Sequence, residues 1–316
     1  MNVYLTFDVE LWCGSWTDLD RRFPSAFERY CYGRSPAGDY ALPKTVELLD
    51  RFGLKGVFFV EPLFSARFGR QWLARMVEII AASGHDVQLH LHPEWTDEIR
   101  PALIAACQTK RQHLTYYTLD EQTALIRSGR ALLEAETGTT VSAFRAGSFA
   151  ANADTYRALA ANDLCVDSSL NACYDHSAGT LGDLRAFTDV RVIEGVRSYP
   201  VTVMRDGIGR LRPAQINGCS HAELSSALHD AWRRGVRHFV IVSHNFEMLK
   251  PGTSEPDWIV VKRFESLCRF LAEHSDRFEV RAFGAETGDD TGASRPQTQL
   301  WTTVHRYAEQ AWRAIR

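Results

Sequence analysis

Short runs of apolar and β-branched residues alternate along the chain with longer stretches in which apolar residues recur every three or four positions. The short runs predict buried strands, and the longer period predicts helices that pack by one face. This alternation indicates an α/β fold built from repeated β-α units around a mostly parallel sheet. Strands are predicted near residues 2–8, 55–60, 86–91, 141–145, 163–167, 198–203, 237–243 and 277–283. Helices are predicted near residues 42–52, 71–83, 119–136, 153–161, 221–234 and 257–274.

Two stretches follow neither period. Residues 11–40 are rich in Trp, Tyr, Gly and Asp, and residues 169–196 have a mixed character, so both are predicted to be long surface loops. Residues 286–296 are polar and rich in Gly, Thr and Asp, and a helix is predicted after them at 299–315. We therefore expect a single domain over residues 1–284, with residues 285–316 forming a polar linker and a C-terminal helix.

Composition and charge mainly exclude classes of partner and of segment. The chain is 45% hydrophobic and 24% charged, as in a soluble globular enzyme, and its net charge of −3 gives no reason to expect a nucleic-acid partner. No run of about 18 apolar residues predicts a transmembrane helix, and Met1 is not followed by the pattern of a signal peptide. The seven cysteines include no Cys-x-x-Cys pair, which fits reduced thiols and predicts a cytoplasmic location.

Carboxylates and histidines follow two of the predicted strands. Asp8 and Glu10 stand two residues apart at the end of the first strand, and His90 and His92 stand in the same relation at the end of the third. Side chains two apart on a strand share one face, and the carboxyl ends of parallel strands form the active-site edge of such folds. Two imidazoles and a carboxylate can hold a divalent metal and leave one position open for a reactant.

Two further polar residues end strands at the same edge. Arg145 lies in the segment Phe144-Arg145-Ala146-Gly147-Ser148-Phe149 and could hold a carboxylate by a bidentate contact, or form an ordinary surface ion pair. His244 follows an apolar strand, and a histidine there suits a general acid because its pKa lies near neutral pH.

These four segments resemble the polysaccharide-deacetylase (NodB-homology) family of carbohydrate esterases, in the order of that family's motifs over about residues 1–283. The resemblance implies a single-domain, irregular (β/α) barrel with about seven parallel strands. It also implies a role for each matching residue: Asp8 as the base, Arg145 as the residue that orients it, His244 as the acid beside the hydrophobic Val242, and Glu10, His90 and His92 as metal ligands.

The chain departs from the family pattern in its metal motifs. The first motif reads Asp-x-Glu instead of Asp-Asp, so the ligand Glu10 is one residue further on. The second motif of the family spaces its histidines by four, and four residues after His90 stands Glu94. The third ligand is therefore His92 or Glu94, and we favour His92 because it shares a strand face with His90.

The activity implied by the resemblance is metal-dependent removal of an N-acetyl group from a sugar, with zinc as the expected metal. The substrate would be a nucleotide-linked or lipid-linked intermediate of lipopolysaccharide, capsule or glycoconjugate assembly, handled in the cytoplasm or at the inner face of the membrane. Candidate residues for contacts with the sugar are Trp12, Trp16, Tyr40, Trp95 and Phe149. Two alternatives stay open: a glycoside hydrolase that uses Asp8, Glu10 or Glu247, and a sugar-binding homologue without activity.

Overall fold

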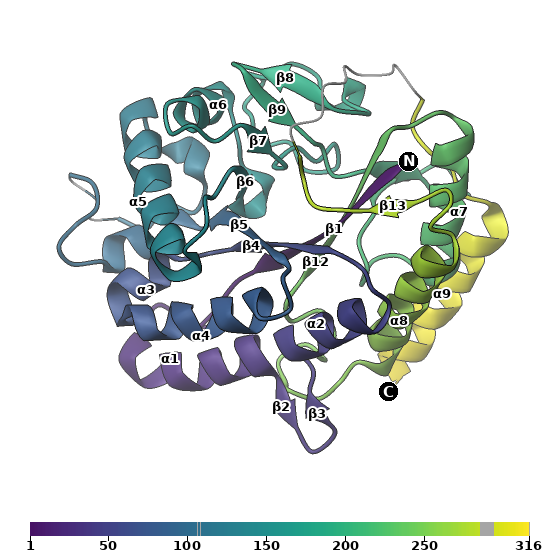
Figure 1. Cartoon of the computed structure of the whole chain (residues 1–316), viewed down its shortest axis with the longest axis horizontal. Helices are drawn as coiled ribbons and strands as arrows, with labels where there is room; N and C mark the ends of the chain where they lie inside the picture. Colours follow the sequence, from purple (N-terminus) through teal and green to yellow (C-terminus); the bar gives the residue numbers. More distant parts are fainter. Residues whose placement is uncertain (106, 108, 285–293, 316) are drawn as a thin grey trace.

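A curled, mostly parallel sheet forms the centre of the molecule (Figure 1). The computed structural model describes residues 1–105, 107, 109–284 and 294–315. Every neighbouring pair in the sheet is parallel except β8 and β9. The predicted α/β fold is thus confirmed as a half-barrel. Its strand order is β12 (His238–His244), β1 (Asn2–Val9), β4 (Gly56–Val60), β5 (Asp86–Leu91), β6 (Ala143–Ala146), β7 (Val166–Asp167), β9 (Val196–Ser198) and β8 (Arg191–Ile193), with β13 (Glu279–Val280) also paired to β1.

Helices cover the outside of the curled sheet (Figure 1). Three of them begin with the reciprocal hydrogen bonds of a capping box, Thr118 with Glu121, Asn152 with Thr155 and Ser220 with Glu223. The six helices predicted before the C-terminal one are all present, with bounds within a few residues of the predicted ones. They are α2 (Leu42–Arg51), α4 (Arg70–Ala81), α5 (Leu119–Thr137), α6 (Ala153–Ala160), α7 (His221–Arg233) and α8 (Trp258–Glu273).

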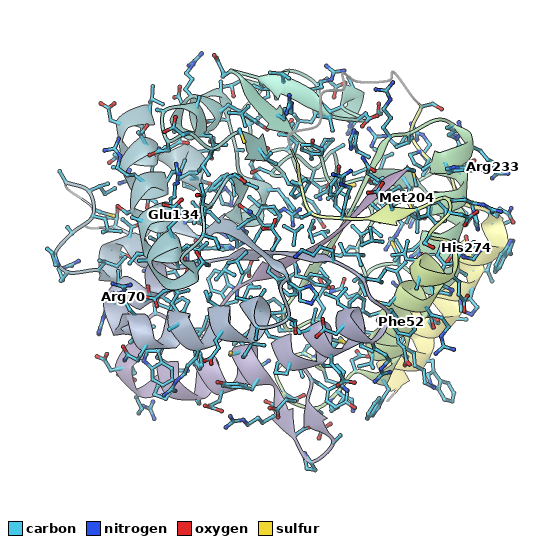
Figure 2. All side chains as sticks on the ribbon, in the orientation of Figure 1. Phe52, Arg70, Glu134, Met204, Arg233 and His274 are labelled. Carbon is cyan, nitrogen blue, oxygen red and sulfur yellow. The ribbon has the colours of Figure 1, made fainter. Side chains whose placement is uncertain are left out.

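Residues that alternate along the strands contribute their side chains to two hydrophobic clusters. On β1, Leu5 and Phe7 belong to the large cluster shared with the helices, whereas Tyr4 belongs to a smaller cluster with Phe59 and Val242 of neighbouring strands. Side chains fill the space between the helices and the sheet (Figure 2). Because side chains alternate along a strand, Asp8 lies on the same face of β1 as Tyr4, toward the concave side of the half-barrel.

The first predicted loop, residues 11–40, is more ordered than expected. It contains α1 (Leu19–Phe27), a π-helical turn (Glu28–Tyr32) and a small hairpin of β2 (Arg34–Ser35) and β3 (Gly38–Asp39). The loop prediction was wrong for α1 because its buried residues Leu19, Phe23, Ala26 and Phe27 do follow a helical period. A short helix α3 (Leu63–Phe68) was also not predicted.

The second predicted loop and the strand predicted after it also differ from expectation. Residues 169–196 include a short 3₁₀ helix (Leu184–Ala186) and β8, which returns antiparallel to β9. The strand predicted at 198–203 is interrupted after Ser198 because Pro200 has no N–H to donate to a ladder. The chain continues into a separate hairpin of β10 (Val203–Arg205) and β11 (Leu211–Pro213).

The predicted C-terminal helix is present as α9 (Leu300–Ile315), packed against α7 (Figure 1). Most of the predicted linker at 286–296 lies outside the described residues, and the division of the chain at residue 284 stays a prediction. Among the helices of the described ranges, none has the length and apolar character that a membrane crossing requires.

Candidate active site

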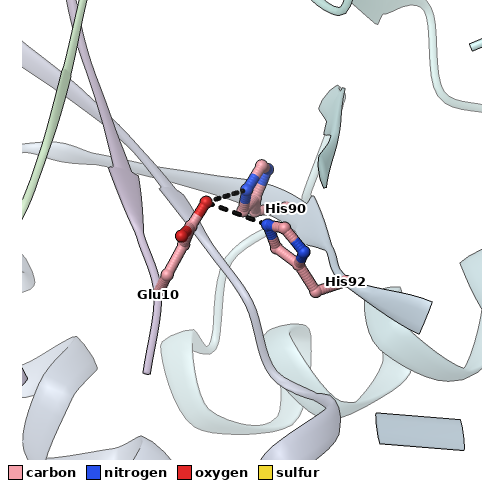
Figure 3. A group of neighbouring side chains, drawn as sticks. All are labelled: Glu10, His90 and His92. Atoms are coloured by element: carbon pink, nitrogen blue, oxygen red, sulfur yellow. Dashed lines mark hydrogen bonds and ion pairs between the residues drawn. The ribbon is translucent and has the colours of Figure 1, made fainter. Parts of the chain in front are cut away.

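Three buried ligand-type side chains converge where β1 and β5 end (Figure 3). The Glu10 Oε1 atom lies 3.1 Å from His90 Nε2 and 2.9 Å from His92 Nε2. Their donor atoms all lie within 4.8 Å of one another, and His90 and His92 reach the same point because they share one face of the β5 end.

The second nitrogen of each imidazole is also hydrogen-bonded. His90 Nδ1 lies 2.8 Å from the backbone oxygen of Arg145, and His92 Nδ1 lies 3.2 Å from Glu94 Oε2. A carbonyl or carboxylate at Nδ1 accepts the proton held there, which leaves Nε2 as the atom that faces Glu10 and could bind a metal, as in metal-binding histidines. The donor set therefore fits a divalent cation. Glu94 lies behind His92, on the side away from Glu10, which supports His92 as the third ligand.

The electrostatics of this cluster are those of a cation site. Burial tends to raise the pKa of Glu10, but the neighbouring His92, His90 and His244 lower it well below its usual range. Burial tends to lower the pKa of His92, but Glu10 and Glu94 raise it well above its usual range. The buried carboxylate thus requires a positive charge beside it, which a proton on His92 or a cation can supply.

A buried ion pair lies next to the cluster. Asp8 Oδ1 is 2.6 Å from Arg145 Nη1, and both side chains are shielded from solvent. Arg145 also donates hydrogen bonds to Thr6 Oγ1 and to the backbone oxygen and side chain of Ser168. Because every nitrogen of the guanidinium is engaged, Arg145 holds the Asp8 carboxylate in one orientation.

His244 lies across from Asp8, since the two residues are in register on the adjacent strands β12 and β1. The His244 Nε2 atom is 3.9 Å from Glu10 Oε1, and its Nδ1 atom is 2.8 Å from Glu247 Oε1. Burial tends to lower the pKa of His244, but the hydrogen bond to Glu247 and the charges of Glu10 and Asp8 raise it to about 9. His244 therefore carries a proton at neutral pH.

Glu247 positions this histidine, a role that the sequence analysis did not predict. Its carboxylate is buried and accepts hydrogen bonds from Ser243 Oγ and Gln215 Nε2 as well as from His244. The spacing His-x-x-Glu across a turn was the only sequence signal for this contact.

A search of solved structures finds this arrangement of strands and helices elsewhere. A putative polysaccharide deacetylase from Mycobacterium smegmatis is 18% identical, with a TM-score of 0.54 over 91% of this chain and 94% of that chain. The chain has the polysaccharide-deacetylase fold. More distant matches are a family 4 carbohydrate esterase from Streptomyces lividans in complex with acetate (14% identity, TM-score 0.46, 93% and 97% covered) and a CE4 family pseudoenzyme from Bacillus anthracis (13%, 0.43, 87% and 62%). No protein-family model and no curated protein matches the sequence.

In the polysaccharide-deacetylase fold, two of the aromatic residues predicted to contact the sugar, Trp12 and Phe149, have different surroundings. Trp12 donates a hydrogen bond from Nε1 to Glu10 Oε2 at 2.7 Å, and its partly exposed ring lies edge-on to His92, with the centroids 4.8 Å apart. Phe149 is partly exposed, has a φ of 56°, and stacks on Tyr174 beyond the end of β6. Trp12 is therefore at the cluster, while a sugar contact of Phe149 stays a prediction.

Two other aromatic predictions are wrong. Trp95 is only 1% exposed and packs between Trp16 and Phe68, so its ring cannot stack on a sugar. Tyr40 is also buried and contacts Trp258 away from the cluster. Trp16 is partly exposed, but Lys110 Nζ lies 3.6 Å from its ring centroid and covers one face. Packing explains Trp95 and Tyr40, whereas a sugar contact of Trp16 stays a prediction.

Glu61 is a buried carboxyl group that the sequence analysis missed. It follows β4 directly, and its carboxyl oxygens accept hydrogen bonds from the backbone N–H groups of Leu63 and Phe64 at the start of α3. Burial raises its pKa to about 8, although those hydrogen bonds oppose the shift. Its position at a strand end, like that of Glu10, was the signal available in the sequence.

Proposed function

We propose that this protein is a metal-dependent hydrolase that removes the acetyl group from an N-acetyl sugar. The observation that carries the proposal is the convergence of a cation site, an oriented carboxylate and a protonated histidine where β1, β5, β6 and β12 end. Its substrate is proposed to be a nucleotide-linked or lipid-linked intermediate of lipopolysaccharide or another cell-surface glycoconjugate.

Glu10, His90 and His92 would hold the metal in this proposal. One carboxylate oxygen and two imidazole nitrogens form a typical donor set for a catalytic zinc ion. When bound, such an ion would acidify a water molecule and polarise the carbonyl of the acetamide. Trp12 would hold the remaining Glu10 oxygen in place through its hydrogen bond.

The other residues divide the proton transfers between them. Asp8 accepts the proton of the attacking water, and Arg145 keeps its carboxylate aimed by the contact of 2.6 Å. His244 donates a proton to the leaving amine, and Glu247 holds its ring from the other side. Since Asp8 and His244 occupy matched positions on adjacent strands, the base and the acid flank one reacting group.

The contacts of the carboxylates do not favour a glycoside hydrolase. That chemistry needs one carboxyl group that gives up a proton and a second one free to act on the sugar. Glu10 is bound to two imidazoles and Glu247 to four hydrogen-bond donors, so neither is free to act as the second carboxyl group beside Asp8. An inactive homologue is not favoured either, because each residue that the proposed reaction needs is present and oriented.

The test is acetate release from a panel of nucleotide-linked N-acetyl sugars, measured together with metal content. We expect release from the zinc-loaded protein, loss after chelation, and recovery when zinc is restored. Asp8→Asn is the matched control because it should keep the metal and lose the reaction. Equal release from the wild type and Asp8→Asn, or no release from any acetylated sugar by metal-loaded protein, would contradict the proposal.

A further inference from the structure

Helix α9 packs with its polar side inward and its apolar side outward. Thr303 and Arg306 are each 1% exposed, whereas Trp301 is 59% exposed and Val304 is 58% exposed. The helix forms the outer layer of the molecule beside α7 and α8 (Figure 1). A surface helix of a globular protein normally buries its apolar stripe, so this orientation is the reverse of the usual one.

Ion pairs hold α9 in this orientation. Arg306 contacts the buried carboxylates of Glu223 at 2.9 Å and Asp206 at 3.1 Å. Thr303 accepts a hydrogen bond from the backbone of Gly207 and donates one to Glu223. A rotation of the helix would leave these buried carboxylates without a cation, so the helix is held with its apolar stripe outward. The stripe is therefore a permanent part of the surface.

The stripe belongs to a larger apolar surface, which we call the α9 face. It gathers most of the large apolar side chains that are exposed among the described residues. Patches of this kind mark sites of interaction. Tryptophan and tyrosine make up half of this one, and these side chains prefer the boundary between water and lipid. The α9 face consists of Ile208, Trp232, Leu300, Trp301, Val304 and Tyr307.

A groove of about 690 Å³ that is lined by two arginine side chains runs along the α9 face, between α7 and the start of α9. Arg233, Arg277 and His229 line it together with Trp232 and Trp301, and no carboxylate is among its described lining residues. Arg233 lies at the upper right edge of the molecule in Figure 2. The carboxylates paired with these arginines, Asp230 and Asp276, lie outside the lining.

The arginines of the groove also affect the pKa of His229. Burial lowers the pKa of His229, and the positive charges of His274, Arg277 and Arg233 lower it further. A groove with cations and aromatic rings, open beside an apolar stripe, complements an amphiphile with an anionic head group.

We propose that the α9 face docks the protein on an anionic lipid surface. Trp301, Val304 and Tyr307 would enter the boundary between head groups and acyl chains, while Arg233 and Arg277 would contact lipid phosphates. A second copy of the chain fits less well, because a symmetric contact would bring the same arginines together. This inference concerns a surface apart from the metal cluster and does not depend on the proposed reaction.

The test is sedimentation of the full-length protein with phospholipid vesicles. We expect binding to vesicles of equal parts phosphatidylglycerol and phosphatidylcholine, and weak binding to phosphatidylcholine alone. Trp301→Ser with Val304→Ser should weaken binding about tenfold or more, since two exposed apolar anchors are lost. Tyr116→Ser is the matched control, because Tyr116 is 58% exposed but lies outside the α9 face. Thermal unfolding would show that all variants stay folded.

A second pair of substitutions tests the charge. Arg233→Gln with Arg277→Gln should reduce binding to the anionic vesicles and the dependence of that binding on salt. Acetate release from a water-soluble substrate should be equal in all these variants, which separates this proposal from the proposed reaction. Absence of vesicle binding, equal binding by all variants, or a dimer that Trp301→Ser with Val304→Ser dissociates would overturn the proposal.

Discussion

Gly147 lies directly against the imidazole of His92. A Cβ atom on Gly147 would come within 2.6 Å of His92 Cε1 and within 2.8 Å of His92 Nε2. Since Nε2 is the atom that faces Glu10, the missing side chain of Gly147 makes room for the ligand geometry itself. The glycine of the Arg-x-Gly-x-Phe segment therefore has a structural reason to be a glycine.

Gly147→Ala should displace His92 and weaken metal binding by about 10- to 100-fold, as for other changes around metal ligands. The affinity can be measured by titration of zinc into the metal-free protein. Gly284→Ala is a suitable control, because a Cβ there would meet nothing closer than a side-chain atom at 3.5 Å. Unchanged affinity in Gly147→Ala would show that His92 does not bind the metal in the orientation described.

The choice between His92 and Glu94 as third ligand can be tested by metal content. His92→Ala should abolish stoichiometric zinc, because it removes one of three converging donors. Glu94→Gln should retain the zinc and lower the affinity by about 10- to 100-fold, since it weakens only the hydrogen bond at Nδ1. The reverse result, an empty site in Glu94→Gln and a full one in His92→Ala, would make Glu94 the ligand.

Asp8→Asn should separate the proton acceptor from the metal site. The amide keeps the shape of the carboxylate and can still accept the hydrogen bond from Arg145, but it cannot take a proton. We expect a folded protein with full zinc content and acetate release lower by about two to four orders of magnitude. Normal turnover with full zinc would assign the base to another group, with Glu10 and Glu94 as the next candidates.

His244→Ala should lower turnover by about two to four orders of magnitude while zinc content stays complete, as for the loss of a general acid. The comparison of metal content with acetate release decides the role. If His244→Ala loses its zinc, the residue is a ligand and the assignment as the acid is wrong.

The rate should also depend on pH through His244. The acid must be protonated, so the rate should be maintained below the pKa of His244 and fall as the pH rises through it. Glu247 raises that pKa toward about 9, so Glu247→Gln should shift the alkaline fall to lower pH. The folded-state pKa lies above the ordinary value of 6.5. The contribution of His244 protonation to the free energy of unfolding is therefore complete below about pH 6.5 and is lost as the pH rises through 9. Glu255→Gln, at an exposed position, is the control; an unshifted profile in Glu247→Gln would contradict the assignment.

The sequence predicted the strands that carry the site and the residue types at the ends of those strands. Strand period places Asp8 and Glu10 on one face and His90 and His92 on another, and this follows from local backbone geometry without knowledge of the fold. Parallel β-α order then brings the carboxyl ends of these strands to one edge. The predictions that depended on these two rules agree with the structure.

Several contacts of the site depend on tertiary packing that strand period does not specify. Strand period cannot show that Glu94 turns behind His92, that Glu247 reaches His244, or that Trp95 is enclosed, because these contacts depend on turns and on residues distant in sequence.

The orientation of helix α9 also depends on residues distant in sequence. Its sequence defines two faces, but their orientation is set by Glu223 and Asp206, about 80 to 100 residues earlier in the chain. Those buried carboxylates require the cation of Arg306, so the polar face turns inward and the apolar face meets the solvent.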